Sequence, residues 1–484
     1  MKFYNRETEL EKLEKLHSLS QGNAFLTVMT GRRRVGKTEL IKHFITNRID
    51  AESRKDCIYI FVDIKQSKIL LGEISEKFKN SLSSDVFVPD FASWDELFRF
   101  IFILAKKKQF TIIFDEFQNF KFIDKGIFST LQKYWDENSG DSKILLIAVG
   151  SFVGLMKNTF QDYKSPLYGR VSSFFALKPF NYETTRKILR DMDYENEVNI
   201  MKIYAVFGGV PKHYLLLENY NIRNANFNEI LMELVVDSDS PLRNEVRNIL
   251  IQEFGRENSI YFSILEAISR GKCSLVDIAN YLDIAPNSLN KYLQELTTYY
   301  EIIERKVPAT EDKPERSKKG RYFIKDNFFR FWFRFIYPNA SELEISNFKR
   351  VFEKIDENIN AYTGSIFEDV CREFLVRCNN KKIKSLNLNF NKIGSWWDRK
   401  GNEIDIAAIG DKEILLGECK WTNKKVDVKI AASLVEKSEF IKTKLKKRFV
   451  LFSKAGFTEG CVEYMREEDI SYIELSDMEG FFDL

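Results

Sequence analysis

The stretch "NAFLTVMTGRRRVGKTELIKHFI", residues 23–45, decides the fold of the N-terminal part of this chain. An apolar run, which we predict to be a buried strand, leads into a glycine-containing loop, and a helical pattern follows. The loop matches the spacing G-x-x-x-x-G-K-[ST], in which backbone N–H groups wrap phosphate oxygens at a helix N-terminus. A chance glycine-rich turn is the alternative, and the strand and helix on either side argue against it. The predicted nucleotide-binding residues are Gly31, Arg32, Arg33, Arg34, Val35, Gly36, Lys37 and Thr38.

Three more apolar runs extend this pattern into a sheet. They are "CIYIFVD" at 57–63, "FTIIFDE" at 110–116 and "ILLIAVGS" at 144–151, and helical patterns separate them. Near-continuous apolar strands that alternate with helices indicate a parallel sheet covered on both faces. We therefore predict an α/β fold for the first part of the chain.

ATP with Mg²⁺ is the ligand that this pattern predicts. Lys37 would reach the β- and γ-phosphates, and Thr38 would ligate Mg²⁺. Asp115 and Glu116 end an apolar strand, where strand termini meet the phosphates. Asp115 would hold the hydration shell of Mg²⁺, and Glu116 would orient or deprotonate the attacking water. A helix-capping pair in a surface loop is the alternative for these two acids.

Two further residues are candidates for the same site. Ser151 follows the strand "ILLIAVG" and could sense the γ-phosphate. Arg170, in "SPLYGR", could act as an arginine finger in cis or from a neighbouring subunit, and the second case would require a homo-oligomer. An ordinary salt bridge is an equally good expectation for an arginine in a loop.

Composition excludes several classes of protein. The 484 residues are 44% hydrophobic and carry a net charge of +3, which indicates globular domains and excludes a polybasic nucleic-acid carrier. Six cysteines without a CxxC pair and only three histidines argue against a zinc site or a Ser-His triad. We find no secretory signal and no apolar stretch long enough to span a bilayer, so we expect a soluble cytoplasmic chain without a membrane partner.

Residues 255–335 carry a second pattern, this one helical. "SLVDIANYLDIAPNSLNKYLQEL", residues 274–296, contains two amphipathic helices joined by a short turn, and Asn287 or Ser288 could cap the second. This is helix-turn-helix spacing, and "KVPATEDKPERSKKGRYFI" at 306–324 would form a β-wing. A module used only for structure or protein docking is the alternative. Four basic residues of the wing could contact DNA phosphates, namely Arg316, Lys318, Lys319 and Arg321.

These motifs together resemble a known family. "GRRRVGKT", "SPLYGR", "GGVPKHY" at 208–214 and "GRYFIKDNFFRFWFRFIYPN" at 320–339 are similar, in this order, to archaeal-type P-loop ATPases of the AAA+/STAND kind that carry a C-terminal nuclease-like domain. The resemblance covers essentially the whole chain. It implies ATP binding, a winged helix and a restriction-endonuclease-like C-terminus, and it places the family's phosphate-binding lysine on Lys37 and its acidic pair on Asp115 and Glu116.

The predicted fold class is therefore α/β with four parts. A RecA-like P-loop ATPase core would occupy residues 1–175, and a helical lid would follow at 176–254. A winged helix-turn-helix would occupy 255–338. A restriction-endonuclease-like α/β domain of the PD-(D/E)XK kind would occupy 339–484.

A predicted hairpin in the last part, "NEIDIAAIGDKEILLGECKWTNK" at 402–424, carries charges within apolar strands. A loop of two or four residues would pair Asp405 with Leu416 or Glu418, and either register puts Asp405 on the face of Glu418 and Lys420. Two carboxylates could hold Mg²⁺ or Mn²⁺, which polarises a phosphodiester and lowers the pKa of a bound water. Lys420 would position that water or stabilise the charged transition state.

This arrangement looks like the D…E-x-K core of PD-(D/E)XK nucleases. Glu368, in "GSIFEDVCREFL", matches the additional acid that such domains place on their first helix, although no Pro-Asp dipeptide precedes the core. The spacing is short and arises often by chance, and an inactive relic would show the same pattern. We predict a chain that couples ATP binding and hydrolysis to DNA binding and metal-dependent phosphodiester cleavage. The alternative is a signalling or scaffold ATPase whose terminal domain only binds a partner.

Overall fold

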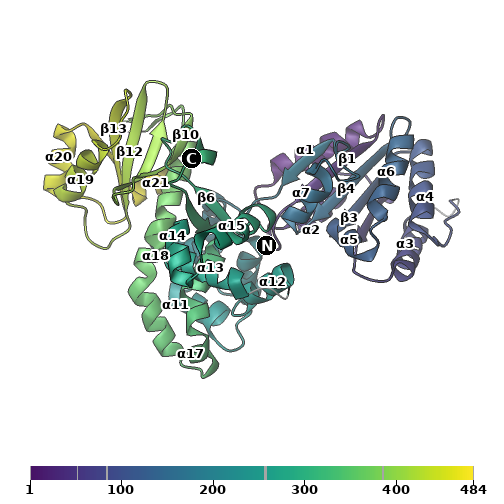
Figure 1. Ribbon diagram of the computed structural model, residues 1–484, viewed down its shortest axis with the longest axis horizontal. Coiled ribbons are helices and arrows are strands. Elements are labelled where there is room, and N and C mark those ends of the chain that lie inside the picture. The colour runs from purple at the N-terminus through teal and green to yellow at the C-terminus, as the bar shows by residue number, and fades with distance from the viewer. Residues whose placement is uncertain (1, 52, 83–85, 256–258, 384–385, 483–484) are drawn as a thin grey trace. The chain divides into compact units, whose positions relative to one another are not determined.

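The computed structural model describes the chain except for residues 1, 52, 83–85, 256–258, 384–385 and 483–484. The chain divides into two compact units (Figure 1). The first consists of Met1–Pro179, Val210–Lys212 and Thr298–Glu301, and the second of Phe180–Gly209, His213–Thr297 and Ile302–Leu484. Within the described residues, no helix is both long enough and apolar enough to cross a membrane.

The first unit is built on a five-stranded parallel sheet with the strand order β2-β3-β4-β1-β5. Four of its strands confirm the predicted apolar runs. The fifth, β5, is a short and partly exposed segment without an apolar run, which is why the sequence did not indicate it. The strand bounds are β1 Phe25–Thr30, β2 Cys57–Phe61, β3 Phe110–Asp115, β4 Ile144–Gly150 and β5 Ser173–Ala176.

Helices cover both faces of this sheet, as the alternation of strands and helices predicted (Figure 1). One face packs on α1 (Glu7–Leu19) and α2 (Lys37–Asn47) through side chains that include Leu13 and Phe44. The other face packs on the longer helices α3, α4 and α6 through an aromatic-rich core. Their bounds, with those of two shorter helices, are α3 Ser67–Ser81, α4 Trp94–Lys107, α5 Phe120–Ile123, α6 Ile127–Asn138 and α7 Val153–Gln161.

The second unit begins with helices, as the sequence predicted for residues 176–250. The chain breaks between α9 and α10, where Gly208 has a positive φ of 58°. Asn181 and Asn196 cap α8 and α9 by accepting hydrogen bonds from backbone N–H groups of the first turn. The bounds are α8 Tyr182–Arg190, α9 Glu197–Phe207, α10 Pro211–Asn219, α11 Phe227–Leu231 and α12 Glu245–Phe254.

Three helices and a two-stranded ribbon follow, at α13 Ser259–Ser269, α14 Leu275–Leu282, α15 Pro286–Gln294, β6 Ile303–Lys306 and β7 Arg321–Ile324. The predicted cap of α15 is wrong by two residues. Ala285 is the N-cap without a side-chain hydrogen bond, and Pro286 occupies the first turn, where its missing N–H costs nothing and its fixed φ suits a helix. The antiparallel ribbon pairs Ile303 with Ile324, so the predicted hairpin is present.

The loop between β6 and β7 lies along β10 (Lys392–Trp397), the edge strand of the C-terminal sheet. Ala309 N donates to Ser395 O at 2.8 Å, and Trp397 Nε1 donates to Lys319 O at 2.9 Å. The first bond covers a backbone carbonyl that an edge strand would otherwise expose to another chain, and the second holds the loop to a side chain of the same strand. The ribbon and the C-terminal sheet are therefore joined within the second unit.

The aromatic stripe at 328–336, whose members recur at helical spacing, packs in the core. Phe328, Phe331, Trp332 and Phe335 are all buried. They lie on α16 (Asn327–Phe331) and on the π-helical turn Trp332–Ile336 that continues it. The stripe therefore belongs to the interior of the second unit.

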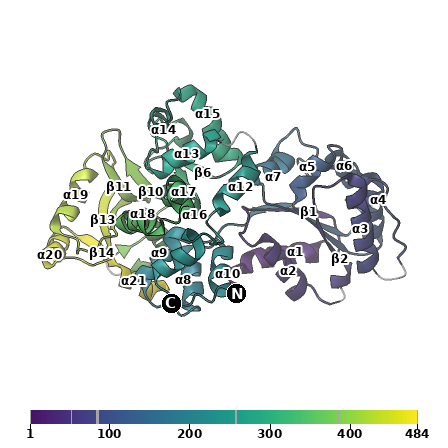
Figure 2. The ribbon, with the colours of Figure 1, turned by 90° about the horizontal axis from the view of Figure 1, so that it is seen from below.

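The C-terminal part of the second unit contains a five-stranded mixed sheet with the order β10-β11-β12-β13-β14. The first three strands are antiparallel, and β12, β13 and β14 are parallel. Figure 2 shows α19 and α20 on one side of this sheet and the long helix α18 on the other. The bounds are α17 Ala340–Glu344, α18 Phe348–Arg377, β11 Glu403–Ile409, β12 Glu413–Lys420, α19 Val428–Ser438, β13 Lys446–Ser453, α20 Glu459–Glu467, β14 Ile470–Glu474 and α21 Leu475–Phe482.

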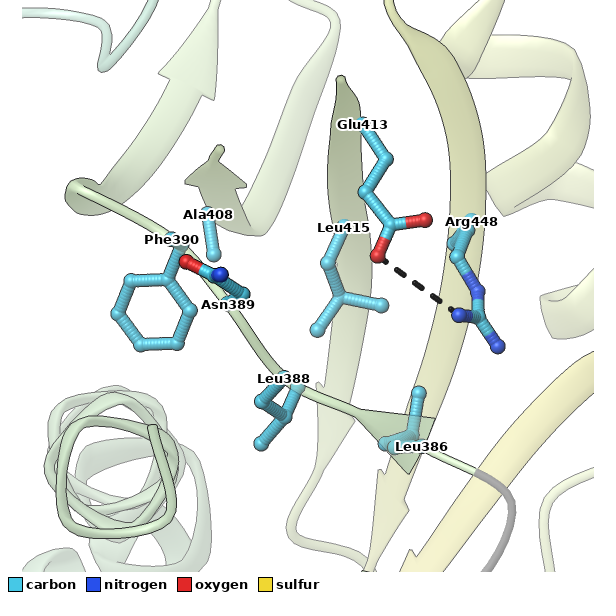
Figure 3. A pocket seen from close by; sticks show the side chains of 8 residues that line it. All are labelled: Leu386, Leu388, Asn389, Phe390, Ala408, Glu413, Leu415 and Arg448. Atoms are coloured by element: carbon cyan, nitrogen blue, oxygen red, sulfur yellow. Dashed lines mark ion pairs between the residues drawn. The ribbon is translucent and has the colours of Figure 1, made fainter. Parts of the chain in front are cut away.

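An ion pair closes the loop end of the β11–β12 hairpin against β13. Arg448 Nη1 lies 3.7 Å from Glu413 Oε1 (Figure 3). The small pocket beside this pair has a volume of about 10 Å³, which holds nothing larger than a water molecule. The hairpin's loop end is thus a packed structural contact, and its charged end lies at the other terminus of the strands.

We predict that Gly209→Ala destabilises the second unit. A Cβ atom at this position would overlap the carbonyl group of Phe180, whose N–H donates to Gly209 O at 2.7 Å. Overpacking against the backbone should lower the free energy of unfolding by about 1–3 kcal/mol. Thermal unfolding measures the effect.

The matched control is Gly364→Ala in the middle of α18, where a Cβ would make an ordinary 3.7 Å contact with Trp421. Removing a glycine from a helix interior should leave stability unchanged or raise it by about 0.5–1 kcal/mol. Equal midpoints for the two variants would contradict the close approach of Gly209 and Phe180.

Candidate functional site

The predicted nucleotide-binding loop connects β1 to α2, and its backbone requires special conformations. Gly36 has a φ of 91° and Arg34 a φ of 71°, which lie in the left-handed region. A Cβ on Gly31 would lie 2.6 Å from the carbonyl oxygen of Leu177. Lys37 is buried, and its Nζ donates to Gly31 O at 2.7 Å and to Arg32 O at 3.0 Å. The loop therefore curls around the lysine ammonium group, and phosphate oxygens can replace these two acceptors.

The structure brings the two predicted Mg²⁺ ligands of this site together. Thr38 Oγ1 donates to Asp115 Oδ2 at 2.9 Å. Tyr59 of β2 donates to the same oxygen at 2.6 Å. Hydroxyl and carboxylate oxygens beside a phosphate-binding loop are the donors that Mg²⁺ prefers, so this donor set fits the ion.

Sequence reasoning missed Tyr59. It lies in a predicted strand, but only the parallel pairing of β2 with β3 brings its side chain to Asp115. Burial raises the pKa of the Tyr59 phenol, and the hydrogen bond to Asp115 raises it further. The phenol therefore remains a neutral donor that orients the carboxylate.

Glu116 is held by residues of two other segments. Ser151 Oγ donates to Glu116 Oε2 at 2.6 Å, and Gln118 Nε2 donates to the same oxygen at 2.5 Å. Strand β4 lies between β1 and β3, so Ser151 at its end lies beside the acidic pair at the end of β3. Glu116 itself has a φ of 56°, an unusual conformation for a residue with a side chain. In this structure Ser151 thus contacts the candidate base, and sensing of the γ-phosphate stays a prediction.

Arg170 forms the salt bridge that the sequence allowed as an alternative to an arginine finger. Its Nε and Nη2 atoms donate to the two carboxylate oxygens of Asp136 at 2.7 and 2.6 Å. This hydrogen bonding raises the pKa of Arg170 above its ordinary value. A finger role would require this pair to open, and it stays a prediction.

Arg33 of the predicted nucleotide-binding loop lies beside an aromatic ring, and Arg34 lies beside the charge of Arg33. The Arg33 guanidinium lies 5.1 Å from the centre of the Phe152 ring, which belongs to the segment after β4. Burial lowers the pKa of Arg34, and the neighbouring Arg33 lowers it further. An anionic ligand would relieve this concentration of positive charge.

The second candidate site lies on the β11–β12 hairpin, whose register matches the four-residue loop. Ile409 pairs with Ile414, and Ile406 pairs with Gly417. Continued by one step beyond the last of these pairs, the same register would set Asp405 opposite Glu418. Lys420 Nζ lies 2.7 Å from Glu418 Oε1. The three charges predicted to gather at one end of the hairpin are therefore on one face.

Crowding of buried carboxylates defines the electrostatics of this site. Burial and the charge of Glu418 raise the pKa of Asp405 to about 6, although its Oδ2 accepts a hydrogen bond from Cys419 N at 2.8 Å. Burial and the charge of Asp405 raise the pKa of Glu368, on α18, to about 8. The charge of Asp405 thus acts on Glu368, and the resemblance implied an additional acid on this helix.

Two basic residues that the sequence analysis missed also reach this cluster. Lys437 of α19 places Nζ 3.3 Å from Glu418 Oε1. Arg372 of α18 donates to the backbone oxygen of Asp405 and, at 3.0 Å, to Ser395 Oγ. The i,i+4 spacing of Glu368 and Arg372 on a helix was a signal for the second residue, whereas nothing in the sequence indicated Lys437.

The arginine is connected to the β6–β7 ribbon through one acid. Arg372 Nη2 donates to Asp369 Oδ1 at 2.7 Å, and Lys306 Nζ of β6 lies 3.5 Å from the same oxygen. Burial alone would raise the pKa of Asp369, but the charges of Arg372, Lys306 and Arg330, with the hydrogen bond from Arg372, together outweigh it and lower that pKa. Asp369 is therefore an ionised link between the ribbon and the acid cluster.

The donor set can hold one divalent cation but not as a complete protein cage. No three His, Cys, Asp or Glu side chains converge as ligands of one ion in the part of the chain that the structure describes. Asp405 and Glu418 would supply two carboxylates, and water and substrate oxygens would complete the shell. Such an oxygen-only set suits Mg²⁺ or Mn²⁺, and a cation would offset the repulsion that raises the acid pKa values.

The first unit defines the class of protein. A lysine-containing loop between a parallel strand and a helix, with an acidic pair at the end of another strand of the same sheet, is the core of a P-loop ATPase. Residues 3–217 match a family described as an ATPase domain predominantly from Archaea. Residues 332–431 match archaeal and bacterial proteins of unknown function.

Uncharacterized protein MJECL04 of Methanocaldococcus jannaschii is 35% identical over 445 residues, which cover 91% of this chain and 92% of that protein. The chain therefore belongs to the family of this archaeal protein. Uncharacterized ATP-binding protein MJ0423 of the same organism is 50% identical over 46 residues, 10% of this chain and 75% of that protein.

Among solved structures, the Walker-type ATPase PABY2304 of Pyrococcus abyssi has a similar fold. The TM-score is 0.52 at 24% identity, and the match covers 69% of this chain and 96% of that chain. This likeness supports the fold of a P-loop ATPase.

We predict that Glu368→Gln removes a pH-dependent loss of stability. Glu368 keeps its proton in the folded chain up to about pH 8 but loses it near its ordinary value of 4.5 when unfolded. Between these values unfolding releases a proton, so the free energy of unfolding falls as pH rises. Without divalent cations, the variant should match the wild type near about pH 5 and exceed it near about pH 9.

Thermal midpoints across this pH range test the prediction. Glu357→Gln, at an exposed position on the same helix, is the matched control and should follow the wild type. If the Glu368→Gln and wild-type curves run parallel throughout, Glu368 is not the crowded acid that its surroundings indicate.

Proposed function

We propose that this protein binds and hydrolyses ATP in its first unit, and that it binds DNA and cleaves phosphodiester bonds in its second unit. The observation that carries the cleavage proposal is the gathering of Asp405, Glu418 and Lys420 on one face of the hairpin, with the charge of Asp405 acting on Glu368 of α18. Buried charges are costly unless they serve a ligand or a partner. Three charged groups at one end of the hairpin, with a fourth on α18, therefore favour a chemical role.

In the ATPase step, the chain's own residues bind and orient the reactants. Lys37 and the loop N–H groups would hold the β- and γ-phosphates, and Thr38 and Asp115 would hold Mg²⁺, which would neutralise phosphate charge when bound. Tyr59 fixes the carboxylate of Asp115. Glu116 would accept a proton from the attacking water, and Ser151 and Gln118 hold Glu116 until a nucleotide changes these contacts.

In the cleavage step, Asp405 and Glu418 would hold a divalent cation that activates water and polarises the phosphodiester when bound. Lys420 would then leave Glu418 and stabilise the negative charge on the phosphate in the transition state. Arg372 would keep β11 in position through the backbone oxygen of Asp405. Glu368, which holds a proton at neutral pH, would donate a hydrogen bond or a proton within the site.

For DNA binding, we assign the three helices and the ribbon to a winged helix-turn-helix. Two of its four predicted phosphate contacts are already engaged within the second unit. Lys319 Nζ donates to Glu311 Oε1 at 2.7 Å, and Arg321 Nη1 donates to Glu403 Oε2 at 3.0 Å. Arg316 and Lys318 are exposed in the loop and are the better candidates for phosphate contacts.

One observation favours the second candidate function, a signalling or scaffold ATPase with an inactive terminal domain. Lys420 and Lys437 both pair with Glu418, at 2.7 and 3.3 Å, and together neutralise this acid. A relic fold stabilised by such pairs would bind DNA or a partner without cutting. Cleavage assays separate the two functions.

We predict that Lys37→Ala abolishes ATP turnover by removing the ammonium group from the phosphates, a loss of at least about 100-fold in kcat/KM. Glu116→Gln should bind ATP but hydrolyse it about 100-fold more slowly, because the amide cannot accept the proton. Phosphate release and nucleotide affinity are the measurements. Lys42→Ala, exposed on the same helix, is the control; release by Lys37→Ala equal to that of the wild type would place hydrolysis elsewhere.

We predict that Asp405→Asn and Glu418→Gln each lower DNA cleavage at least about 100-fold, because each removes a carboxylate ligand of the cation. Supercoiled and linear DNA with Mg²⁺ or Mn²⁺, with and without ATP, are the substrates. Glu413→Gln is the matched control, because it lies on the same strand at the loop end beside Arg448 (Figure 3).

Products that persist in both acid variants would show that another site cuts the DNA. Wild-type protein that shifts DNA in a gel only with a particular nucleotide, and never cuts it, would favour the scaffold function. Thermal midpoints measured alongside exclude unfolding of the variants as the cause.

A further inference from the structure

A basic cavity lies in the second unit, apart from the acid cluster. It is open and has a volume of about 590 Å³. Its walls come from the turn after α13, the end of α14, the π-helical turn Trp332–Ile336 with the residues after it, and α18. The side chains that matter for its chemistry are Arg270, Lys272, Tyr281, Arg334 and Lys354.

The charged side chains that line this cavity are all basic. Its lining contains two arginines and two lysines but no acidic residue. Arg270 and Lys354 are balanced from outside the lining, by Glu266 at 2.9 Å and Glu342 at 3.1 Å. Lys272 and Arg334 form no ion pair with any residue that the structure describes, so the cavity carries an excess of two positive charges.

Two of the basic groups, Arg334 and Lys354, are held in place by hydrogen bonds, whereas Lys272 is exposed and lines the cavity from the turn after α13. Arg334 Nη1 donates to Ser269 O at 3.3 Å. Lys354 Nζ donates to Asn339 Oδ1 at 2.5 Å, and Asn339 is itself anchored to Phe335 O at 2.8 Å. A preorganised arrangement of donors loses less entropy on binding an anion than mobile surface lysines do.

The cavity also offers an aromatic surface. Tyr281, at the end of α14, is 41% exposed although it lines the cavity. An exposed tyrosine ring beside cations suits a ligand with both a flat base and a phosphate, because bases stack on aromatic rings. The volume falls within the range of small-ligand sites. A purely apolar ligand would bury Lys272 and Arg334 without compensation, which is costly.

We infer that this cavity binds a nucleotidyl phosphate, with the phosphate against Lys272 and Arg334 and the base against Tyr281. The group could belong to single-stranded nucleic acid or to a free nucleotide, since both present the same chemistry. The site shares no residue with the P-loop or with the acid cluster, so it does not rest on cleavage by the hairpin. It would be a separate ligand-binding site on the helices of the second unit.

Fluorescence anisotropy of the full-length protein tests this inference. The probes are a short labelled oligothymidylate and labelled thymidine monophosphate, measured without divalent cation in proteins that all carry Lys37→Ala, so that the P-loop does not hold the probe's phosphate. Lys272→Glu and Arg334→Gln should each weaken binding about tenfold, and for the oligonucleotide each should reduce the salt dependence by about one released ion. Tyr281→Ala should weaken binding of both probes but leave the salt dependence unchanged.

The matched control is Lys187→Glu, an exposed lysine on α8 in the same unit with the same change of charge. Tighter binding of the oligonucleotide than of the monophosphate by the protein with an intact cavity identifies nucleic acid as the ligand, and binding of the monophosphate at least as tight identifies a free nucleotide. If the cavity variants bind both probes as the Lys187→Glu control does, the inference is overturned. Loss of DNA cleavage with unchanged probe binding would instead concern the acid cluster.

Discussion

Burial of carboxylates at strand ends is the constraint on which both candidate sites depend. An acid in a sheet interior is unfavourable unless hydrogen bonds, cations or a proton compensate it. Asp115 is compensated by two hydroxyl donors, Thr38 and Tyr59. Glu418 is compensated by Lys420 and Lys437, and Glu368, which lies on the helix α18 and not on a strand, keeps its proton instead. A divalent cation can replace the hydroxyl donors, the lysines or the proton that offset these acids. The acids can therefore bind a ligand in addition to stabilising the fold.

The two sites differ in how the protein holds its acids. In the first unit, neutral donors orient Asp115 and Glu116, and such donors can remain in place when an ion arrives. In the second unit, lysines hold Glu418, and at least one of them must move for a cation to bind. The first arrangement is that of a site ready for its ligand, whereas the second requires a rearrangement of charge before chemistry. This difference explains why the proposed cleavage function has a scaffold alternative with its own structural support.

The β6–β7 ribbon connects helices α13, α14 and α15 to the C-terminal sheet, and this connection bears on function. Its loop hydrogen-bonds to β10, and Lys306 pairs with Asp369, which in turn pairs with Arg372. Arg372 contacts the backbone of Asp405. A ligand that moves the ribbon would therefore shift Asp369 and Arg372, and with them the backbone of Asp405. This series of contacts is a physical route that would couple ligand binding to the acid cluster.

The sequence by itself determined the elements whose signals are local. Apolar runs predicted four strands of the parallel sheet, the phosphate-loop spacing located Lys37 and Thr38, and alternation along the hairpin put Asp405 on the face of Glu418. Tertiary structure decided the contacts between residues that are far apart in the sequence. Tyr59 reaches Asp115 because two strands pair, Lys437 reaches Glu418 because α19 folds over the sheet, and Arg170 meets Asp136 across more than a helix of intervening chain. Spacing along the sequence indicates the period of a helix or strand and the register of a hairpin. It does not indicate which distant residue a long side chain contacts after folding.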